Sequence, residues 1–487
     1  MFMLLLDITI VNVALPDIQR ELGASFSDLQ WVVDAYALTL ASFLLTAGSL
    51  GDRLGRRRVF AFGFAIFTIA SLLCGLSTDP TMLNLFRALQ GIGAAGMLAT
   101  TLALIAQEFH GPERATAFGI WGATIGGAVA VGPLVGGALT DAFGWEWIFF
   151  VNVPIGIAAI ALTLTKVAES RAPDAEPVDW PGVATFSVSL FLLVFGLVRG
   201  NSEGWSSALI EGSLFGSAVL MLAFLVIQLR SSHPMLELGL FRKPAFVGVS
   251  LASFALHAGM FAMFLYIVIY VQNVLGFTPL EAGVRFLPIT VLSFFVAPVA
   301  GKLLNKVPAR VFFGLGLGLV GVGLLLMRGV SDDSTWTTLL AGFMVAGIGI
   351  GMTNPAIGST AVGVVQPRKA GMASGINNTF RQLGTATGIA ALGAIFQSGI
   401  ESRLPAQAPS GAAEGIASAG PQVAGQGGQG AVDTATHAFV GAFNEILLIG
   451  ATVAFAGAVA GFALTRPRDL VVEGAPEEIL EGEPVAA

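Results

Sequence analysis

The sequence predicts an all-α integral membrane protein, with fourteen transmembrane helices arranged as two six-helix halves and an inserted helix pair. Of the 487 residues, 55% are hydrophobic and only 11% are charged, whereas soluble domains carry about 25% charged residues. Apolar runs long enough to cross a bilayer recur along the whole chain. Between two of these runs, the segment GSLGDRLGRRR holds the densest cluster of charge. A soluble multidomain protein is therefore excluded.

The apolar runs set the expected helices, because a bilayer core about 30 Å thick needs roughly 20 apolar residues per helix. The first run, 1–16, is short and contains Asp7. We expect either that the natural chain starts upstream of it or that this helix is thinly anchored. The other expected spans are 31–51, 59–77, 82–105, 115–140, 147–165, 181–199, 208–228, 246–271, 283–303, 311–327, 337–362, 370–397 and 438–464.

Basic residues predict the orientation of the chain, since Lys and Arg accumulate in cytoplasmic loops. We assume that the first helix runs outward from the cytoplasm. Of the 24 lysines and arginines, only five then fall on the outer face, namely Arg20, Arg199, Arg285, Arg328 and Arg403. Both termini are therefore predicted to be cytoplasmic, in a multi-pass protein of the cell (inner, cytoplasmic) membrane.

A weak internal repeat divides the chain. GSLGDRLGRRRVF at 48–60 has a degraded echo, GKLLNKVPARVFF, at 301–313. Transporters built from parallel repeats hold substrate between the two halves, near the middle of the membrane. The predicted units are an N-terminal bundle at 1–165, an inserted helix pair with its linkers at 166–245, a C-terminal bundle at 246–464 that includes a flexible external loop at 399–436, and an acidic cytoplasmic tail at 465–487.

The charged loop itself predicts a latch between helices. Its glycines allow a sharp turn and close helix approach. Asp52 can accept hydrogen bonds from backbone N–H groups at a helix start, or pair with a loop arginine. Such a latch breaks when the protein changes conformation; the alternative is a plain basic stop-transfer loop. The residues of the predicted latch are Gly48, Asp52, Arg53, Gly55, Arg56 and Arg57.

Two ionisable residues fall at matching depths inside the predicted membrane. Asp7 lies about 13 Å below the outer end of its helix, and Arg87 lies about 9 Å below the same face, at 1.5 Å per residue. A buried arginine is costly unless it is paired or hydrated. We expect Arg87 to face a cavity and to promote loss of a proton from a nearby carboxyl group; the alternative is that it snorkels to the outer headgroups.

Several motifs together resemble a known family. The Gly/Asp/Arg loop resembles the signature loop between the second and third helices of the major facilitator superfamily. The glycine-rich segment GGAVAVGPLVGG matches the signature of the superfamily's exporters, especially its proton antiporters, with a glycine-rich dimerisation face as the alternative. The residues of this motif are Gly126, Gly132, Pro133, Gly136 and Gly137.

Four further segments extend the resemblance over nearly the whole chain. They are LDITIVNVALP, WVVDAYALTLA, FGWEWIFFVNVPIG and YVQNVLGFTPLEAGVRFLP. With them, the chain resembles the fourteen-helix drug/proton antiporter family, the relatives of the staphylococcal and enterobacterial multidrug exporters. The resemblance implies a major facilitator fold, with helices 1 and 4 lining the cavity. It makes Asp7 the expected proton carrier and Arg87 the residue that tunes it.

Other polar and aromatic residues complete the candidate site. Asp34 and Glu445 are further candidates for proton coupling, although Asp34 could be a solvated helix-end residue. His257 is open to a plain packing role. We expect Arg381 to cap the cavity near the cytoplasmic side. The candidate cavity residues are Asn12, Tyr36, Trp121, Phe254, His257, Tyr266, Gln272, Asn354, Asn377, Phe380 and Arg381.

The expected activity is proton-driven export of lipophilic small molecules, cationic ones included, by alternating access. No enzyme, cofactor, metal or nucleic acid is expected, and the protein should be a monomer in the bilayer. ATP is an improbable energy source, because the sole Gly-Lys dipeptide, Gly301-Lys302, is followed by Leu303 rather than by the Ser or Thr of a phosphate-binding loop. One alternative is a dedicated exporter of a single natural product or metabolite. The other is a membrane receptor or scaffold of the same fold that does not transport.

Overall fold

The computed structural model describes residues 2–170, 177–406, 408–409 and 411–466. Some positions, Asn12, Gly126 and Pro133 among them, are described by their backbone alone. The predicted acidic tail lies outside these residues apart from its first two. Within the described chain the regular structure is helical throughout, without a strand. Eleven helices are long and apolar enough to cross a membrane, which confirms the prediction of an all-α membrane protein; the count of fourteen crossings stays a prediction.

In the N-terminal half, a single glycine separates the second long helix from the third. Gly55 has φ +114°, a conformation that L residues rarely adopt, and it ends one helix and precedes the next. The short first run of the sequence is a full helix in the structure. The elements of this half are α1 (Phe2–Leu22), α2 (Phe26–Leu54), α3 (Arg56–Gly75), α4 (Pro80–Glu108), α5 (Gly111–Phe143), α6 (Trp147–Phe150) and α7 (Asn152–Lys166).

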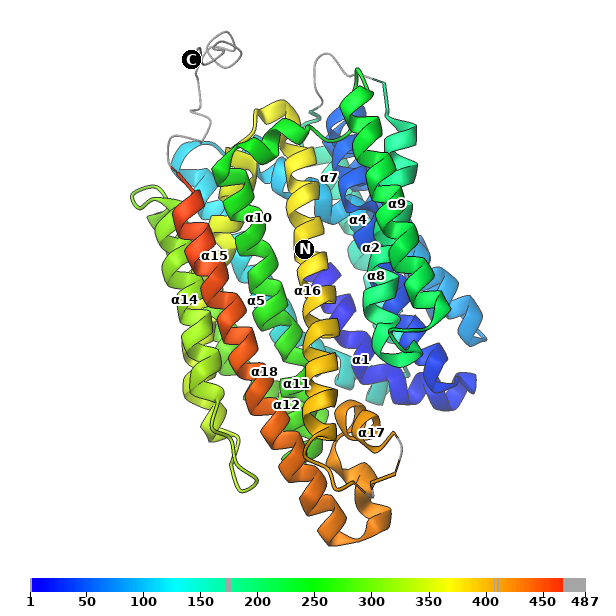
Figure 1. The fold of residues 1–487 in the computed structure, drawn as a ribbon. Helices are drawn as coiled ribbons and strands as arrows, with labels where there is room; N and C mark the ends of the chain where they lie inside the picture. Colours follow the sequence, from blue (N-terminus) through cyan, green and yellow to red (C-terminus); the bar gives the residue numbers. More distant parts are fainter. Residues whose placement is uncertain (1, 171–176, 407, 410, 467–487) are drawn as a thin grey trace.

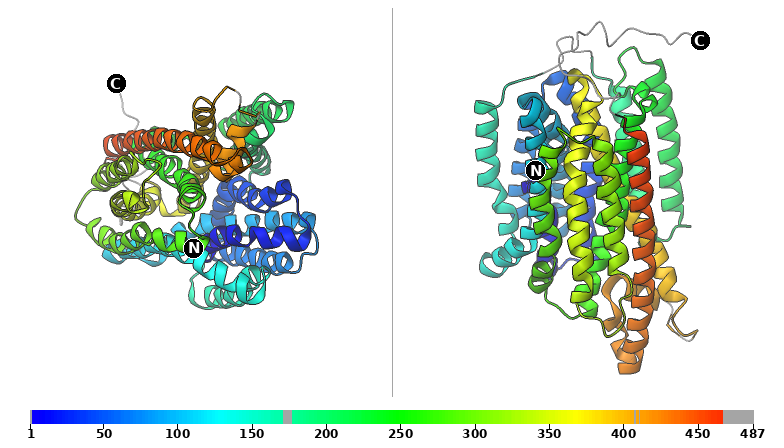
Figure 2. Two further views of the ribbon diagram at one scale, coloured as in Figure 1. Left: turned by 90° about the horizontal axis from the view of Figure 1, so that it is seen from below. Right: turned by 90° about the vertical axis from the view of Figure 1, so that its left-hand side faces the viewer.

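An inserted helix pair follows, α8 (Trp180–Glu203) and α9 (Ala208–Arg230), with the short 3-10 helix η1 (Leu238–Arg242) after it. Figure 2 shows the two halves side by side with this pair at the seam between them. Apolar side chains of α8 pack there against both α2 and α16, so the pair contacts each half.

The C-terminal half is less regular than the N-terminal half. Its first span is interrupted by two π-helical segments, η2 and η3, which often mark functional sites. The elements are α10 (Pro244–Leu256), η2 (His257–Phe261), α11 (Ala262–Ile269), η3 (Tyr270–Val274), α12 (Pro279–Arg285), α13 (Leu287–Leu303), α14 (Ala309–Met327), α15 (Thr337–Gly363), η4 (Pro367–Lys369), α16 (Ala370–Glu401), α17 (Ala412–Ala419), η5 (Pro421–Gly427) and α18 (Gln429–Leu464) (Figure 1).

The segment 399–436, predicted to be a flexible loop, instead has regular structure. It contains the end of α16, then α17, η5 and the first turns of α18. Ala413 and Ile416 of α17 are buried, and Asn273 donates a hydrogen bond to the carbonyl oxygen of Ala419 at 3.0 Å. Composition alone predicted flexibility because the segment is rich in Gly, Ala, Gln and Ser, and it missed these few apolar anchors.

The two halves touch closely at one end of the bundle. We call this the Arg-rich end, because it carries Arg53, Arg56 and Arg57 in the turn between α2 and α3. There α2 crosses α16: a Cβ on Gly48 would overlap the backbone of Gly371. At the same end, a Cβ on Gly119 of α5 would lie only 2.8 Å from Pro298 of α13. Small residues thus let both helix pairs come into backbone contact.

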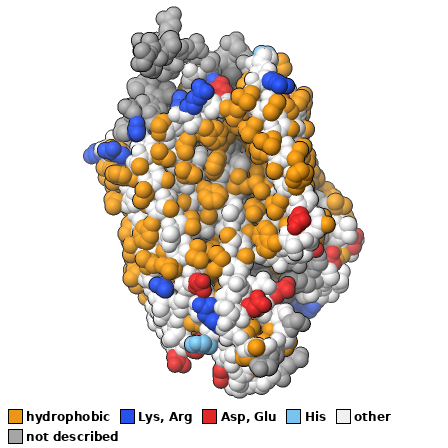
Figure 3. Space-filling model, viewed as in Figure 1, with side chains coloured by type: hydrophobic (Ala, Val, Ile, Leu, Met, Phe, Trp, Pro, Cys, Tyr) orange, Lys and Arg blue, Asp and Glu red, His pale blue; other side chains and the backbone are white. Residues whose placement is uncertain are grey.

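The outer surface of the bundle suits a lipid environment. In Figure 3, apolar side chains cover the middle of the visible face, while charged side chains gather toward its ends. Helix α9 illustrates the pattern, since Phe215, Leu222 and Leu229 are 64–73% exposed. Exposed apolar area on this scale fits contact with acyl chains better than contact with water.

Candidate functional site

Asp7 and Arg87 form an ion pair deep inside the N-terminal half. Arg87 Nη1 lies 2.6 Å from Asp7 Oδ2, and each residue is only 1% exposed. Asp7 sits in the second turn of α1, and Arg87 lies two turns into α4. The structure therefore brings together the two residues that the sequence placed at matching depth.

Three neutral side chains complete a closed network around this pair. Gln90 Nε2 donates to Asp7 Oδ1 at 2.9 Å, and Asn152 Nδ2 donates to the same oxygen at 3.2 Å. Both amides also donate to Ser71 Oγ, at 3.1 and 3.0 Å. Sequence reasoning did not assign these residues, although Gln90 lies three positions after Arg87 and Asn152 belongs to a quoted motif. Helices α1, α3, α4 and α7 thus all contribute to one polar cluster.

Arg87 has further partners that fix its position. Its Nε donates to the carbonyl oxygen of Val32 at 2.9 Å, and its Nη1 donates to Gln90 Oε1 at 2.7 Å. The guanidinium carbon lies 4.4 Å from the centre of the Tyr36 ring, a cation–π distance. Tyr36, predicted to line the cavity, is buried there, and its hydroxyl has no hydrogen-bond partner among the described residues.

The negative charge of Asp7 holds this cluster together. The carboxylate of Asp7 accepts three hydrogen bonds, one of them from a cation. Protonation removes the negative charge and weakens the ion pair, which leaves an uncompensated buried guanidinium. The four helices that hold the network must then rearrange or admit water.

Asp34 lies apart from this network and pairs with the inserted helix α8. Its carboxylate is 3.8 Å from Arg199 Nη1, and that guanidinium also bonds Gln30 at 2.9 Å and Glu203 at 3.2 Å. Asp34 is therefore a half-buried, paired carboxylate. Arg199, which the distribution of basic residues assigns to the outer side of the membrane, is only 5% exposed within the seam. No motif or spacing along the chain predicted this contact.

Glu445, a candidate for proton coupling, lies outside any buried network. Its side chain is 46% exposed and pairs with Arg403 at 3.2 Å. That pair joins α18 to the segment just after α16. The neighbouring Asn444 donates to the carbonyl oxygen of Val330 at 2.8 Å, which fixes a loop. The residues around Glu445 are apolar, so the sequence did not indicate that its side chain is exposed. One face of α18 is turned outward at this point.

The predicted latch residues form a second buried cluster at the Arg-rich end. Asp52 Oδ1 accepts two hydrogen bonds from Arg56, at 2.9 and 2.6 Å. The backbone N–H groups of Gly371 and Met372, at the start of α16, donate to the two carboxylate oxygens at 2.9 and 2.8 Å. Arg56 also donates to the carbonyl oxygen of Pro367. Charge on α2 thus meets the N-terminus of a helix from the other half.

The other two arginines of the motif reach different segments. Arg57 lies 3.7 Å from the carboxylate of Glu169, and its backbone N–H donates to that carboxylate at 3.1 Å. Gly55 leaves room for this carboxylate, since a Cβ there would lie 2.7 Å from its oxygen. Arg53 donates to the carbonyl oxygens of Pro177, His233 and Pro234, which lead into α8 and out of α9.

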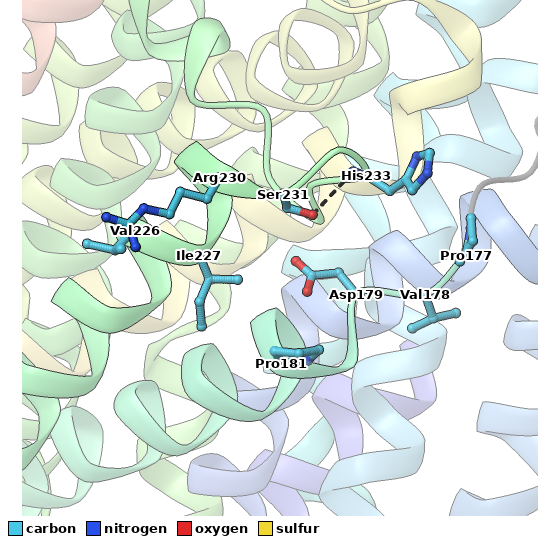
Figure 4. A pocket seen from close by; sticks show the side chains of 9 residues that line it. All are labelled: Pro177, Val178, Asp179, Pro181, Val226, Ile227, Arg230, Ser231 and His233. Carbon is cyan, nitrogen blue, oxygen red and sulfur yellow. Dashed lines mark hydrogen bonds between the residues drawn. The ribbon is translucent and has the colours of Figure 1, made fainter.

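A hollow of about 500 Å³ lies between the start of α8 and the end of α9 (Figure 4). Both carboxylate oxygens of Asp179 already accept hydrogen bonds within the protein. One accepts from the N–H of Gly182 at 2.9 Å and so caps α8, and the other accepts from Gln228 at 2.7 Å. The dashed line in Figure 4 is the N–H of His233 donating to Ser231 at 3.2 Å. The hollow is far from the Asp7 network in the fold and adds no reactive group.

The exporter-type motif on α5 packs against α1. A Cβ on Gly132 would overlap the side chain of Thr9, and one on Gly136 would lie 2.8 Å from Ile10 Cγ1. Gly137 has nothing within 4 Å of such an atom. At Gly126 and Pro133 the structure describes the backbone alone. Close packing against the helix that carries Asp7 therefore explains two of the five motif residues.

The predicted cavity residues separate into two groups. Tyr266 donates to the carbonyl oxygen of Ile389 at 2.9 Å and packs on Phe396, inside the C-terminal half, and Phe380 packs in the seam with α8. Phe254 on α10 and Gln272 in η3 are both half-buried. At Asn12 the structure describes the backbone alone. The second group is buried near the centre and comprises Trp121, His257, Asn354, Asn377 and Arg381.

Arg381 lies within the span of α16, and its side chain is buried. It is the twelfth residue of α16, so it sits about 16 Å from the Arg-rich end of that helix at 1.5 Å per residue. Its Nε donates to His257 Nε2 at 3.1 Å. The helix α16 extends on both sides of Arg381, and the role of this residue as a cap of the cavity near the cytoplasmic side stays a prediction.

A helical bundle of two packed halves, with buried charge pairs on its inner helices, is an architecture that membrane transporters use. A family model described as Major Facilitator Superfamily matches residues 1–389. The chain belongs to this superfamily, whose members are transporters rather than enzymes.

Characterised relatives agree with the resemblance to drug exporters. The chain is 36% identical to "Multidrug resistance protein Stp" of Mycobacterium tuberculosis over 405 residues, covering 83% of this chain and 75% of that protein. It is 34% identical to the "Tetracenomycin C resistance and export protein" of Streptomyces glaucescens, with the same shares covered. The human organic anion transporter MFSD10 shares the fold, with a TM-score of 0.61, 14% identity, and coverage of 93% of this chain and 97% of that chain.

Proposed function

We propose that this protein exports lipophilic small molecules across the bacterial cytoplasmic membrane in exchange for protons. Asp7 carries the proton and Arg87 holds its ionised form. The observation that carries the proposal is the buried Asp7–Arg87 pair, 2.6 Å apart and almost inaccessible to solvent. Buried ionisable groups in a membrane protein are costly and mark ion or proton pathways.

The topology that we propose has fourteen crossings and cytoplasmic termini. The eleven long apolar helices, the two shorter ones in α1 and α13, and the 33-residue α5 support that count. The Arg-rich end, in this orientation, faces the cytoplasm, as the distribution of basic residues favours. The proton gradient then lies across the bundle in the direction that drives export.

The closed Arg-rich end supports assignment of this conformation to the state that is shut toward the cytoplasm. Gly48 packs on Gly371, and Asp52 holds the start of α16. In this state Asp7 takes a proton from outside and the network around Arg87 loosens. The halves rock, the latch opens, and substrate enters from the cytoplasm or inner leaflet. An inward proton supplies about 2.3 kcal/mol per 100 mV of membrane potential, plus the pH difference.

The decisive experiment uses vesicles with imposed pH and voltage gradients and a fluorescent lipophilic dye. We expect Asp7→Asn to insert and fold with reduced stability, since Arg87 loses its counter-charge, and to lose gradient-driven efflux, because its amide does not exchange a proton. Asp433→Asn, an exposed carboxylate change on α18, is the matched control and should transport normally. Efflux at the normal rate by the Asp7→Asn protein rules out Asp7 as the carrier.

The second candidate function is export of one natural product rather than of many drugs. The relative from Streptomyces glaucescens that is named for resistance to, and export of, tetracenomycin C favours it. A panel of structurally unrelated dyes and antibiotics separates the two candidates: a multidrug exporter transports several classes, whereas a dedicated exporter transports one.

A further inference from the structure

Arg381 is a buried cation without a carboxylate. Four arginines are buried in the described chain: Arg56, Arg87, Arg199 and Arg381. The first three pair with Asp52, Asp7 and Glu203 respectively. Among the described residues, no carboxylate oxygen lies within 4.0 Å of a nitrogen of Arg381, and its Nη1 is buried without a hydrogen-bond partner. A charge removed from water in this way needs a counter-charge.

The side chain that Arg381 does contact is uncharged. Arg381 Nε donates to His257 Nε2 at 3.1 Å, so this imidazole nitrogen must carry a lone pair. The other ring nitrogen, Nδ1, lies 2.8 Å from the carbonyl oxygen of Ser253 and therefore carries the hydrogen. The histidine is thus neutral, and the Arg381–His257 pair has a net charge of +1. Stacking on Phe261, at 4.5 Å between ring centres, holds the imidazole in place.

Other unpartnered donors lie close by. The guanidinium carbon of Arg381 is 5.8 Å from the ring of Trp121, whose buried Nε1–H has no partner in the described chain. Asn377, one helical turn before Arg381 on α16, is 1% exposed, and neither of its amide atoms is bonded. Native proteins rarely leave such groups unsatisfied except where a ligand, an ion or water completes them.

This cluster spans the two halves, while the Asp7 network does not. Trp121 is on α5 of the N-terminal half, and Arg381 and His257 are on α16 and η2 of the C-terminal half. Asn378, beside Asn377, donates across the same boundary to the carbonyl oxygen of Leu98 at 3.4 Å. A ligand bound at Arg381 therefore contacts both halves, as alternating access requires.

We propose that Arg381 is the anchor of an anion-recognising substrate subsite. The preferred cargo is a flat, lipophilic molecule with a carboxylate, phenolate or enolate oxygen, which pairs with the guanidinium while its ring lies against Trp121. The inference rests on the proposed export function and narrows its substrate class: anions, rather than the cations expected from the sequence, are the favoured cargo. Arg87 does not compete for such a group while Asp7 is ionised, because the two then form an ion pair.

The test uses purified protein in detergent and three probes with one ring system: pyrenebutyrate, its neutral carboxamide, and a pyrenebutyl-trimethylammonium cation. We expect wild type to bind the carboxylate about tenfold more tightly than the carboxamide, since a charge-assisted hydrogen bond is roughly twice as strong as a neutral one. Arg381→Gln should bind both probes equally, and Arg381→Lys should keep part of the preference. Arg403→Gln, a change outside the bundle, is the control.

Two results overturn the proposal: equal binding of carboxylate and carboxamide by wild type, or an undiminished preference in Arg381→Gln. If Arg381→Gln does not fold, the comparison of the three probes on wild type and Arg381→Lys still decides, and tightest binding of the cation refutes the subsite. Asp7→Asn separates the two proposals. This variant should keep the preference for the carboxylate probe. If it loses proton-driven transport while that preference is intact, the result bears on the export mechanism and not on the anion subsite.

Discussion

The carboxylate of Asp52 on α2 accepts the backbone N–H of Met372 at the start of α16, with 2.8 Å between oxygen and nitrogen. The two residues belong to different halves of the bundle and are 320 positions apart. Asp52 is only 7% exposed, and Arg56 balances its charge from the same turn. A short charged loop in the sequence thus becomes a bond between the halves, at the end where their helices are in backbone contact.

Removing the charge of Asp52 should open that end of the protein. Asp52→Asn keeps the shape but loses the charged acceptor for two backbone N–H groups and Arg56, each bond worth about 1.5–3 kcal/mol. The population with the Arg-rich end open should rise about tenfold or more. A Ser374→Cys reporter on α16, fully buried in this state, measures it by its rate of labelling with a water-soluble maleimide in a Cys74→Ala background.

The same reporter in an Asp433→Asn background provides the control, because that carboxylate is exposed and distant in the fold. Unchanged labelling of the Asp52→Asn protein contradicts the latch and leaves the loop with a purely topological role.

Two adjacent glycines of the α5 motif should respond differently to alanine. Gly136→Ala places a methyl group 2.8 Å from Ile10, and relief of such overlap costs about 1–3 kcal/mol. Gly137→Ala meets nothing within 4 Å and should be neutral or stabilise the helix by up to about 1 kcal/mol. Thermal unfolding in detergent measures both. Equal destabilisation by the two changes contradicts the packing explanation of the motif.

Asp7 and Arg87 should show strong energetic coupling. Removing one member of a buried ion pair costs about 3–5 kcal/mol, because the other charge is left uncompensated. Arg87→Gln alone should therefore lower the unfolding midpoint strongly. The double variant Asp7→Asn, Arg87→Gln should be more stable than the sum of the single changes predicts. Additive effects in this cycle mean that the pair does not act as a unit.

The sequence predicted the helices and the Asp7–Arg87 pair because both depend on distances along the chain. Apolar length sets the spans, and a rise of 1.5 Å per residue sets the depth of each charge. The partners Gln90, Asn152 and Ser71 were missed, because depth does not tell which face of a helix meets which neighbour. That choice is made by tertiary packing.

Contacts with the inserted helix pair were the least predictable. Arg199 meets Asp34 only because α8 packs in the seam between α2 and α16, and no repeat or spacing indicates that position. The exposure of Glu445 was not predictable either, because an apolar helix can still turn one residue outward; its role in proton coupling stays a prediction. The unpartnered donors of Arg381 and Trp121 are likewise visible only when helices from both halves are brought together.

The last prediction concerns how the inserted pair is held. Arg53 donates to carbonyl oxygens of Pro177, His233 and Pro234, at 3.2 and 3.1 Å for the last two. In Arg53→Ala these bonds are lost, and the segment between α9 and η1 should open locally more often. Amide hydrogen exchange at Met235 and Leu236, which bond to Asp179 and Gln228, should become about tenfold faster, as loss of about 1.4 kcal/mol predicts. Arg58→Ala is the matched control, since Arg58 belongs to the same loop but is 67% exposed and pairs with Glu169 instead. Its exchange at these two amides should equal that of wild type. If Arg53→Ala also leaves exchange unchanged, the charged loop does not anchor the pair, and α8 and α9 are held by their apolar contacts with α2 and α16 alone.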